Sequence, residues 1–185
     1  NYGTDMMMIG SCFTENIGEK LAYFKFPVDI NPFGIVYNPF SVASCLELLT
    51  DGKQFTEADL LYNKNVWVSL YHHGRFSSPD KELCLKQINQ RIEQSSLILK
   101  KASLLVITWG TSWVYSHNKT GEVVSNCHKF PASDFRRFRL TPEAIIERYF
   151  KLIKSIRTVN PNLKFVFTIS PIRHWKDGAH GNQLS

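Results

Sequence analysis

Along the chain, short runs of hydrophobic residues alternate with longer stretches in which hydrophobic and polar residues are mixed. The apolar runs predict buried strands, and these lie at residues 5–9, 26–30, 102–110 and 162–171. Apolar residues spaced three and four apart predict helices, and these lie at residues 14–24, 41–49, 79–101 and 141–159. Because strands and helices alternate, the sequence predicts an α/β fold with a mostly parallel sheet.

Three other segments refine this pattern. Residues 66–78 alternate and predict a strand or an extended loop, and residues 113–126 resemble a hairpin with its turn near Gly121. Thr141 and Pro142 suit the N-cap and first position of the last helix.

Parallel sheets bind ligands beyond the carboxyl ends of their strands. The predicted strands are followed by four loops with unusual residues, at 10–13, 31–39, 110–115 and 170–180. We therefore expect these four loops to converge.

Length and composition are those of one globular domain spanning residues 1–185, with 43% apolar and 21% charged residues. No stretch approaches the roughly 18 apolar residues of a membrane helix, so we expect no membrane partner. The net charge of +6 is concentrated between residues 136 and 157. Charge alone would allow nucleic-acid binding, but no nucleic-acid module pattern is present. We interpret this stretch as a solvated helix face that could also attract anionic substrates, and we expect no nucleic-acid partner.

The cysteines and histidines do not form a metal-binding pattern. Cys12, Cys45, Cys84 and Cys127 include no C-x-x-C pair, and Cys45 and Cys84 suit core positions of helices. Free thiols favour a reducing, cytoplasmic compartment. We expect no metal and no organic cofactor.

Ser11 is the first candidate for chemistry. It follows Gly10 at a strand-to-helix turn, where helix N–H groups could stabilise a developing oxyanion. The alternative is that Ser11 only caps the helix, with Thr14 as a rival cap. Cys12 is a rival nucleophile, because a helix N-terminus lowers the pKa of a thiol.

Candidate bases and donors lie in the other loops. His174 and His180 follow the last predicted strand, and Asp177 with His180 forms an Asp-x-x-His pattern that could orient an imidazole. His128 is a third candidate base. Substrate or oxyanion contacts could come from Gly34, Asn38, Gly110, Thr111 and Asn126, with ordinary turn chemistry as the alternative for each. Trp109, Trp113 and Tyr115 could line a sugar or acyl pocket, or simply pack in the core.

The stretch GSCFTENIGEKL resembles the signature of the GSCFA family, with Thr14 in place of the alanine. The segments NPFGIVYNP, ITWGTSWVY, SNCHKFP and SPIRHWKDGAHGNQLS fit the same family in the same order. The resemblance runs from about residue 7 to the end.

The GSCFA family is similar to the SGNH/GDSL hydrolases, which implies a three-layer flavodoxin-like fold. It places Ser11 at the nucleophile position and Gly34 at the second-block glycine. The third block departs from the pattern, since Gly110-Thr111-Ser112 stands where Gly-x-Asn is expected. Asn126 could replace the missing asparagine, and His128 lies beside it.

The resemblance also implies an ester hydrolase or acyl transferase that acts through an acyl-enzyme on a small-molecule or carbohydrate ester. The alternative is a non-catalytic ligand-binding domain of the same fold. Family members carry their Asp-x-x-His further along the chain, so the DGAH of residues 177–180 is either the catalytic pair or a structural turn. In the second case we expect this chain to be a fragment that lacks its catalytic pair. The sequence makes no prediction about the oligomeric state.

Overall fold

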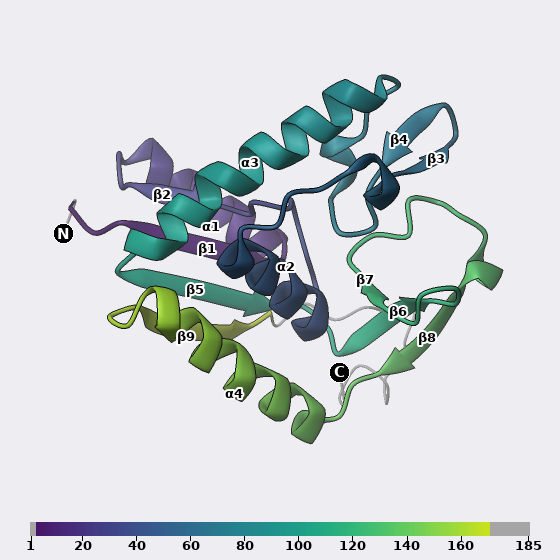
Figure 1. The fold of residues 1–185 in the computed structure, drawn as a ribbon. Coiled ribbons are helices and arrows are strands. Elements are labelled where there is room, and N and C mark those ends of the chain that lie inside the picture. The colour runs from purple at the N-terminus through teal and green to yellow at the C-terminus, as the bar shows by residue number, and fades with distance from the viewer. Residues whose placement is uncertain (1–2, 171–185) are drawn as a thin grey trace.

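The computed structural model describes residues 3–170 (Figure 1). Within that range the central sheet has four parallel strands in the order β2-β1-β5-β9. These strands are β1 (Met6–Gly10), β2 (Val28–Ile30), β5 (Leu104–Trp109) and β9 (Lys164–Ile169). In register, Met8 lies opposite Val106, which lies opposite Val166. The predicted α/β fold with a mostly parallel sheet is confirmed.

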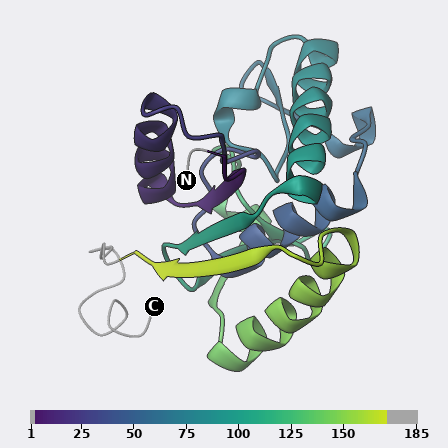
Figure 2. The same ribbon diagram turned by 90° about the vertical axis from the view of Figure 1, so that its left-hand side faces the viewer.

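Helices cover both faces of this sheet and make a three-layer α/β fold (Figure 2). They are α1 (Cys12–Tyr23), α2 (Pro39–Asp51), α3 (Lys81–Lys101) and α4 (Pro142–Val159). Met7, Ile9, Leu105 and Ile107 alternate along β1 and β5 and are buried in one core with residues of α2, α3 and α4. The helix α1 lies on the opposite face.

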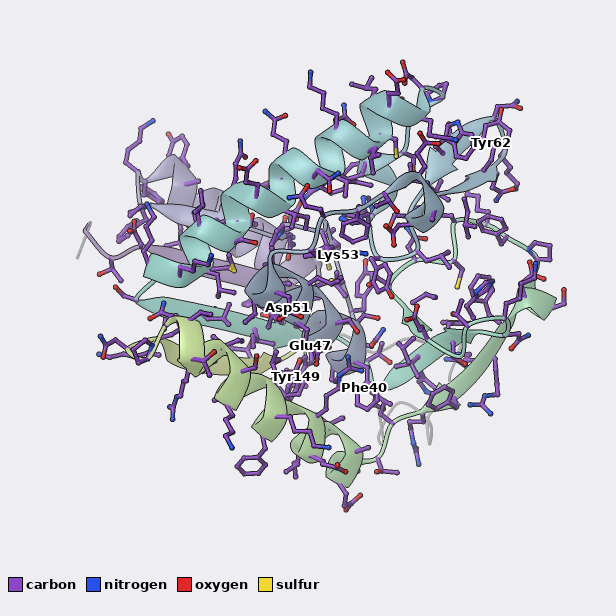
Figure 3. The ribbon with its side chains drawn as sticks, in the orientation of Figure 1. Phe40, Glu47, Asp51, Lys53, Tyr62 and Tyr149 are labelled. Atoms are coloured by element: carbon purple, nitrogen blue, oxygen red, sulfur yellow. The ribbon has the colours of Figure 1, made fainter. Side chains whose placement is uncertain are left out.

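The helices α2 and α4 pack side by side near the carboxyl end of the sheet, and Figure 3 labels Phe40, Glu47 and Tyr149 at this contact. The buried Tyr149 hydroxyl donates to the Pro39 carbonyl at 2.9 Å. Arg148 pairs with Glu47 at 2.8 Å and lies 4.7 Å from the centre of the Phe40 ring. These contacts fix α2, and with it the loop that leads from β2.

Two small antiparallel sheets flank the core. One pairs β3 (Leu61–Asn63) with β4 (Val66–Val68), and the other has the order β7-β6-β8. The latter contains β6 (Trp113–His117), β7 (Val123–Val124) and β8 (Phe135–Arg139). The predicted hairpin is therefore confirmed. The interpretation of residues 136–157 as one helix face is wrong, because Arg136, Arg137 and Arg139 lie on β8 and only the later basic residues lie on α4.

Helix caps confirm some predictions and move others. Thr141 caps α4 as predicted, with Oγ1 accepting from the Ala144 N–H at 3.3 Å. The first helix begins at Cys12 rather than Thr14, because Ser11 takes the N-cap backbone position. Cys45 and Cys84 are buried core thiols as predicted, and none of the four cysteines forms a disulfide bond within residues 3–170. None of the helices within residues 3–170 is both long and apolar enough to cross a membrane.

Candidate functional site

Three of the four predicted loops meet at the carboxyl end of the sheet. The Val36 N–H donates to the Gly10 carbonyl at 2.9 Å, and the Gly110 N–H donates to the Tyr37 carbonyl at 2.7 Å. The loops after β1, β2 and β5 therefore converge as expected. The fourth loop is described only at Ser170, and His174, Asp177 and His180 lie outside the described residues.

The turn between β1 and α1 requires glycine at position 10. Gly10 has φ of +147°, and a Cβ there would lie 2.2 Å from the Thr108 carbonyl oxygen. The next N–H, from Ser11, donates to the same Thr108 oxygen at 3.3 Å. The chain thus leaves β1 pressed against β5, with Ser11 at the N-cap of α1.

Ser11 occupies the N-cap position without capping the helix. Its side chain makes no capping hydrogen bond, although the backbone is extended as in other N-caps. The residue is only 2% exposed, and its Oγ has no hydrogen-bond partner within residues 3–170. Because the first N–H groups of a helix lack intrahelical acceptors, this hydroxyl lies beside free donors and the positive end of the helix dipole.

Cys12 stands next to Ser11 in the first turn of α1 and is partly exposed. The Tyr37 side chain lies near Cys12. Burial raises the pKa of Tyr37, and the electrostatic interaction with the Cys12 thiolate raises it further. Cys12 therefore borders the same loops as Ser11 and stays an alternative nucleophile.

Gly110 lies beside Ser11. A Cβ at Gly110 would lie 3.5 Å from the Ser11 Cβ and 3.2 Å from Tyr37 Cδ1. Its N–H and that of Thr111 both donate to the Tyr37 carbonyl, at 2.7 and 3.3 Å. Of the predicted contact residues, Gly110 is placed best to face a group bound at Ser11, but its N–H is engaged here.

Gly34 has a structural requirement of its own. It has φ of +82°, and a Cβ would lie 2.2 Å from the Cβ of His73, so the segment around His73 passes directly over it. The Gly34 N–H donates to the Asn31 carbonyl at 2.8 Å. To serve an oxyanion, this N–H would have to leave that carbonyl, and the predicted donor role stays a prediction.

Asn38 caps α2. Its Oδ1 accepts from the Ser41 N–H at 2.7 Å, and its Nδ2 donates to Ser41 Oγ at 2.9 Å. Both ends of the amide are used in turn chemistry, which was the alternative interpretation for this residue.

Asn126 and His128 organise the loop that follows β7. Asn126 Oδ1 accepts from the His128 N–H at 2.9 Å. His128 Nε2 lies 2.8 Å from the Ser69 carbonyl and 2.9 Å from the His72 carbonyl, so this nitrogen must carry the proton. Burial lowers the pKa of His128. Its Nε2 thus acts as a donor to the backbone.

An apolar groove of about 450 Å³ begins at Gly110 and runs between α4 and β9. Its walls include Trp109, Ile145, Tyr149, Phe150 and Phe167. Trp109 is anchored by a 2.9 Å hydrogen bond from its Nε1 to the Tyr149 hydroxyl. Trp109 thus packs against the core and also lines this groove, so both of the predicted alternatives apply to it.

Asn31 is a site residue that the sequence did not predict. Its Oδ1 accepts from the Gly10 N–H at 2.8 Å, so it touches the residue before Ser11. The signal was its place in NPFG directly after β2, but the partner lies 21 residues away in the chain. Within residues 3–170 no group of three or more His, Cys, Asp or Glu side chains could hold a metal ion.

Comparison with known proteins gives one match. The model of the GSCFA family matches residues 5–185. Searches of curated proteins and of solved structures found no match. The match spans nearly the whole chain and includes the turn that carries Ser11, and we conclude that the chain belongs to the GSCFA family.

Proposed function

We propose that this chain carries the nucleophile of a serine ester hydrolase or acyl transferase, with Ser11 as the attacking residue. The observation that supports it best is the Ser11 hydroxyl, which is buried at a helix N-terminus and makes no hydrogen bond with the described residues. Membership of the GSCFA family supports a hydrolase-like function. The finer proposal is an acyl ester substrate, carried by a small molecule or a carbohydrate.

In the proposed reaction, Ser11 Oγ attacks the ester carbonyl carbon while a base takes its proton. The resulting oxyanion is stabilised by N–H groups at the start of α1. The tetrahedral intermediate collapses, the bond to the alcohol oxygen breaks, and the base returns the proton to the leaving alcohol. Water, or an acceptor alcohol, then attacks the acyl-enzyme and frees Ser11.

Within residues 3–170 no histidine is hydrogen-bonded to Ser11 Oγ. Ser11 Oγ has no partner there, and His72 and His128 are engaged with Ser69 and with backbone carbonyls. His174, His180 and Asp177 remain the proposed candidates within this sequence. Because Ser11 is 2% exposed, substrate can reach it only if a neighbouring loop moves.

A non-catalytic binding domain of the same fold is the second candidate. Two observations favour it: Gly110-Thr111-Ser112 lacks the asparagine of the related hydrolases, and the N–H groups of Gly34 and Gly110 are already hydrogen-bonded. Such a protein would keep the turn and lose the chemistry.

Labelling with a fluorophosphonate probe separates these functions. We would label the 185-residue chain and a C-terminally longer form, each with Ser11→Ala, Cys12→Ala and the exposed Ser133→Ala as matched control. The proposal expects labelling that Ser11→Ala abolishes and the other two leave intact. Labelling of the longer form alone would place the base beyond Ser185. Absence of labelling in both forms would favour the binding domain, and activity lost only in Cys12→Ala would favour thiol chemistry.

A further inference from the structure

A chain of hydrogen bonds connects Asn31, Glu15 and Arg75 to Gly10, the residue before Ser11. Asn31 is fully buried directly after β2 and has φ of +43°. Its Oδ1 accepts from the Gly10 N–H at 2.8 Å, and its Nδ2 donates to Glu15 Oε2 at 2.6 Å. Glu15 lies in the first turn of α1, so the amide links the strand before Ser11 to the helix after it.

Arg75 closes this chain from a third segment. It belongs to the short 3-10 helix η2 (Gly74–Phe76). Its Nη1 donates to Glu15 Oε1 at 2.7 Å and its Nη2 to the Asn31 carbonyl at 2.6 Å. Three segments distant in sequence therefore contact one another beside the turn.

The donors and acceptors allow only one orientation of the Asn31 amide. A carboxylate only accepts hydrogen bonds and a guanidinium only donates them. Glu15 therefore requires the NH₂ group of Asn31 to face it, which directs Oδ1 to the Gly10 N–H. Arg75 in turn holds the Glu15 carboxylate in place. The ion pair of Glu15 with Arg75 thus determines the orientation of the buried Asn31 amide.

Both peptide groups of Gly10 are held as a result. The Gly10 N–H is fixed by Asn31, and its carbonyl accepts from the Val36 N–H at 2.9 Å. The position of the Ser11 Cα is therefore determined by these two peptide planes. Reaction rates are sensitive to displacements of about 1 Å in such a group, which can cost roughly 100-fold.

We propose that Asn31 is the positioning residue of Ser11, and that Glu15 and Arg75 orient its amide. The inference rests on the proposed function of Ser11 as a nucleophile. It adds a group that does not touch substrate but determines where the nucleophile stands.

The test exchanges the charge pair. In the double variant Glu15→Arg with Arg75→Glu, an ion pair can form again, but position 15 now offers only donors to Asn31. The amide is then expected to rotate and present its NH₂ to the Gly10 N–H, which breaks that hydrogen bond. Glu15→Met and Arg75→Met are the single variants, since methionine offers Asn31 neither an amide oxygen nor a carboxylate. Glu57→Met, in the ion pair of Glu57 with Lys81 at 2.8 Å, is the matched control.

Two readouts are measured on the full chain: the rate of fluorophosphonate labelling at Ser11, and hydrogen exchange of the Gly10 amide by NMR. We expect both single variants to slow labelling at least about tenfold, as loss of an orienting partner commonly does, and to accelerate Gly10 exchange. The charge-swapped double variant should stay as impaired as the single variants in both readouts, because its ion pair leaves the Asn31 amide without an acceptor. Glu57→Met should leave both unchanged.

The result that overturns the inference is a double variant that recovers both labelling and slow Gly10 exchange, since a purely structural ion pair would behave in that way. Unchanged Gly10 exchange in Glu15→Met would also overturn it. If neither the parent chain nor its longer form is labelled, the proposed function fails, while the hydrogen exchange of the Gly10 amide still decides whether Asn31 holds the turn.

Discussion

Two buried polar clusters lie near the carboxyl end of the sheet, and they use their side chains in opposite ways. At the Ser11 turn, the backbone of Gly10 makes the hydrogen bonds and the Ser11 hydroxyl makes none with the described residues. At the second cluster, the side chains of His72 and His128 make the contacts. His72 Nδ1 lies 2.9 Å from Ser69 Oγ, and its ring stacks on Phe33 at 4.7 Å.

The difference separates structural residues from candidates for chemistry. His128 donates to two carbonyls and His72 packs among aromatic rings, so both hold loops in place. A histidine in such a position need not be catalytic. The Ser11 hydroxyl contributes no hydrogen bond to the folded structure within residues 3–170, but Thr14 Oγ1 and His72 Nε2 share this feature. It supports the proposed role of Ser11 only together with the place of Ser11 at the strand-to-helix turn.

The largest effect is expected from Gly10→Ala, which breaks the first cluster. The new Cβ would lie 2.2 Å from the Thr108 oxygen, and an alanine at φ of +147° is strained even without that collision. We expect a loss of at least about 3 kcal/mol in the free energy of unfolding, measured by urea denaturation.

Gly121→Ala is the matched control, because Gly121 has φ of +73° but no atom within 4 Å of a new Cβ. It should cost only about 1 kcal/mol. Equal losses in the two variants would mean that backbone conformation, rather than the contact with Thr108, explains the glycine at position 10.

Much of this site follows from local sequence pattern. The apolar runs located β1, β5 and β9, and the strand-to-helix turn at Gly10 and Ser11 could be read from short-range signals. The rule that parallel strands end at one edge then brought three loops together.

Other features depend on contacts between distant residues. Asn31 acquires its role only when β2 lies beside β1, and nothing around it in the sequence names Gly10 or Arg75 as partners. The strand β8 was missed because its sequence FRRFR is dominated by charge. Arg137 lies 4.0 Å from the centre of the Trp113 ring, so an aromatic neighbour on β6 accommodates the cation.

Lowering the pH should reduce the free energy of unfolding through His72 in the second cluster, by less than Gly10→Ala does. Burial, and then the charge of His128, lower the pKa of His72 from 6.5 to about 3. Above pH 6.5 neither the folded nor the unfolded state carries this proton, and the contribution to stability is complete. Between pH 6.5 and 3 the unfolded state binds the proton and the folded state does not. Stability should therefore fall by about 1.4 kcal/mol per pH unit, or about 2 kcal/mol at pH 5.

The measurement is the free energy of urea unfolding between pH 5 and 7, above the range where carboxylates titrate. His72→Gln should flatten the slope, although it lowers stability at neutral pH. The exposed neighbour His73→Gln should leave the slope as in the parent. A parent chain with no slope in this range would show that His72 can be protonated in the folded state.

The smallest effect is expected from Thr14→Val, which sharpens the first cluster. Thr14 is fully buried one turn after Ser11, and its Oγ1 also has no hydrogen-bond partner in the described part of the chain. Valine keeps the shape and removes a hydroxyl whose burial is unfavourable, so the free energy of unfolding should be unchanged or rise by up to about 1 kcal/mol. Thr168→Val is the control, because Thr168 Oγ1 lies 2.8 Å from Thr108 Oγ1 and its loss should cost about 1 kcal/mol. If Thr14→Val is destabilised as much as Thr168→Val, then the Thr14 hydroxyl does have a hydrogen-bond partner. The same would then be expected of the Ser11 hydroxyl, and its contrast with the histidine cluster would be lost.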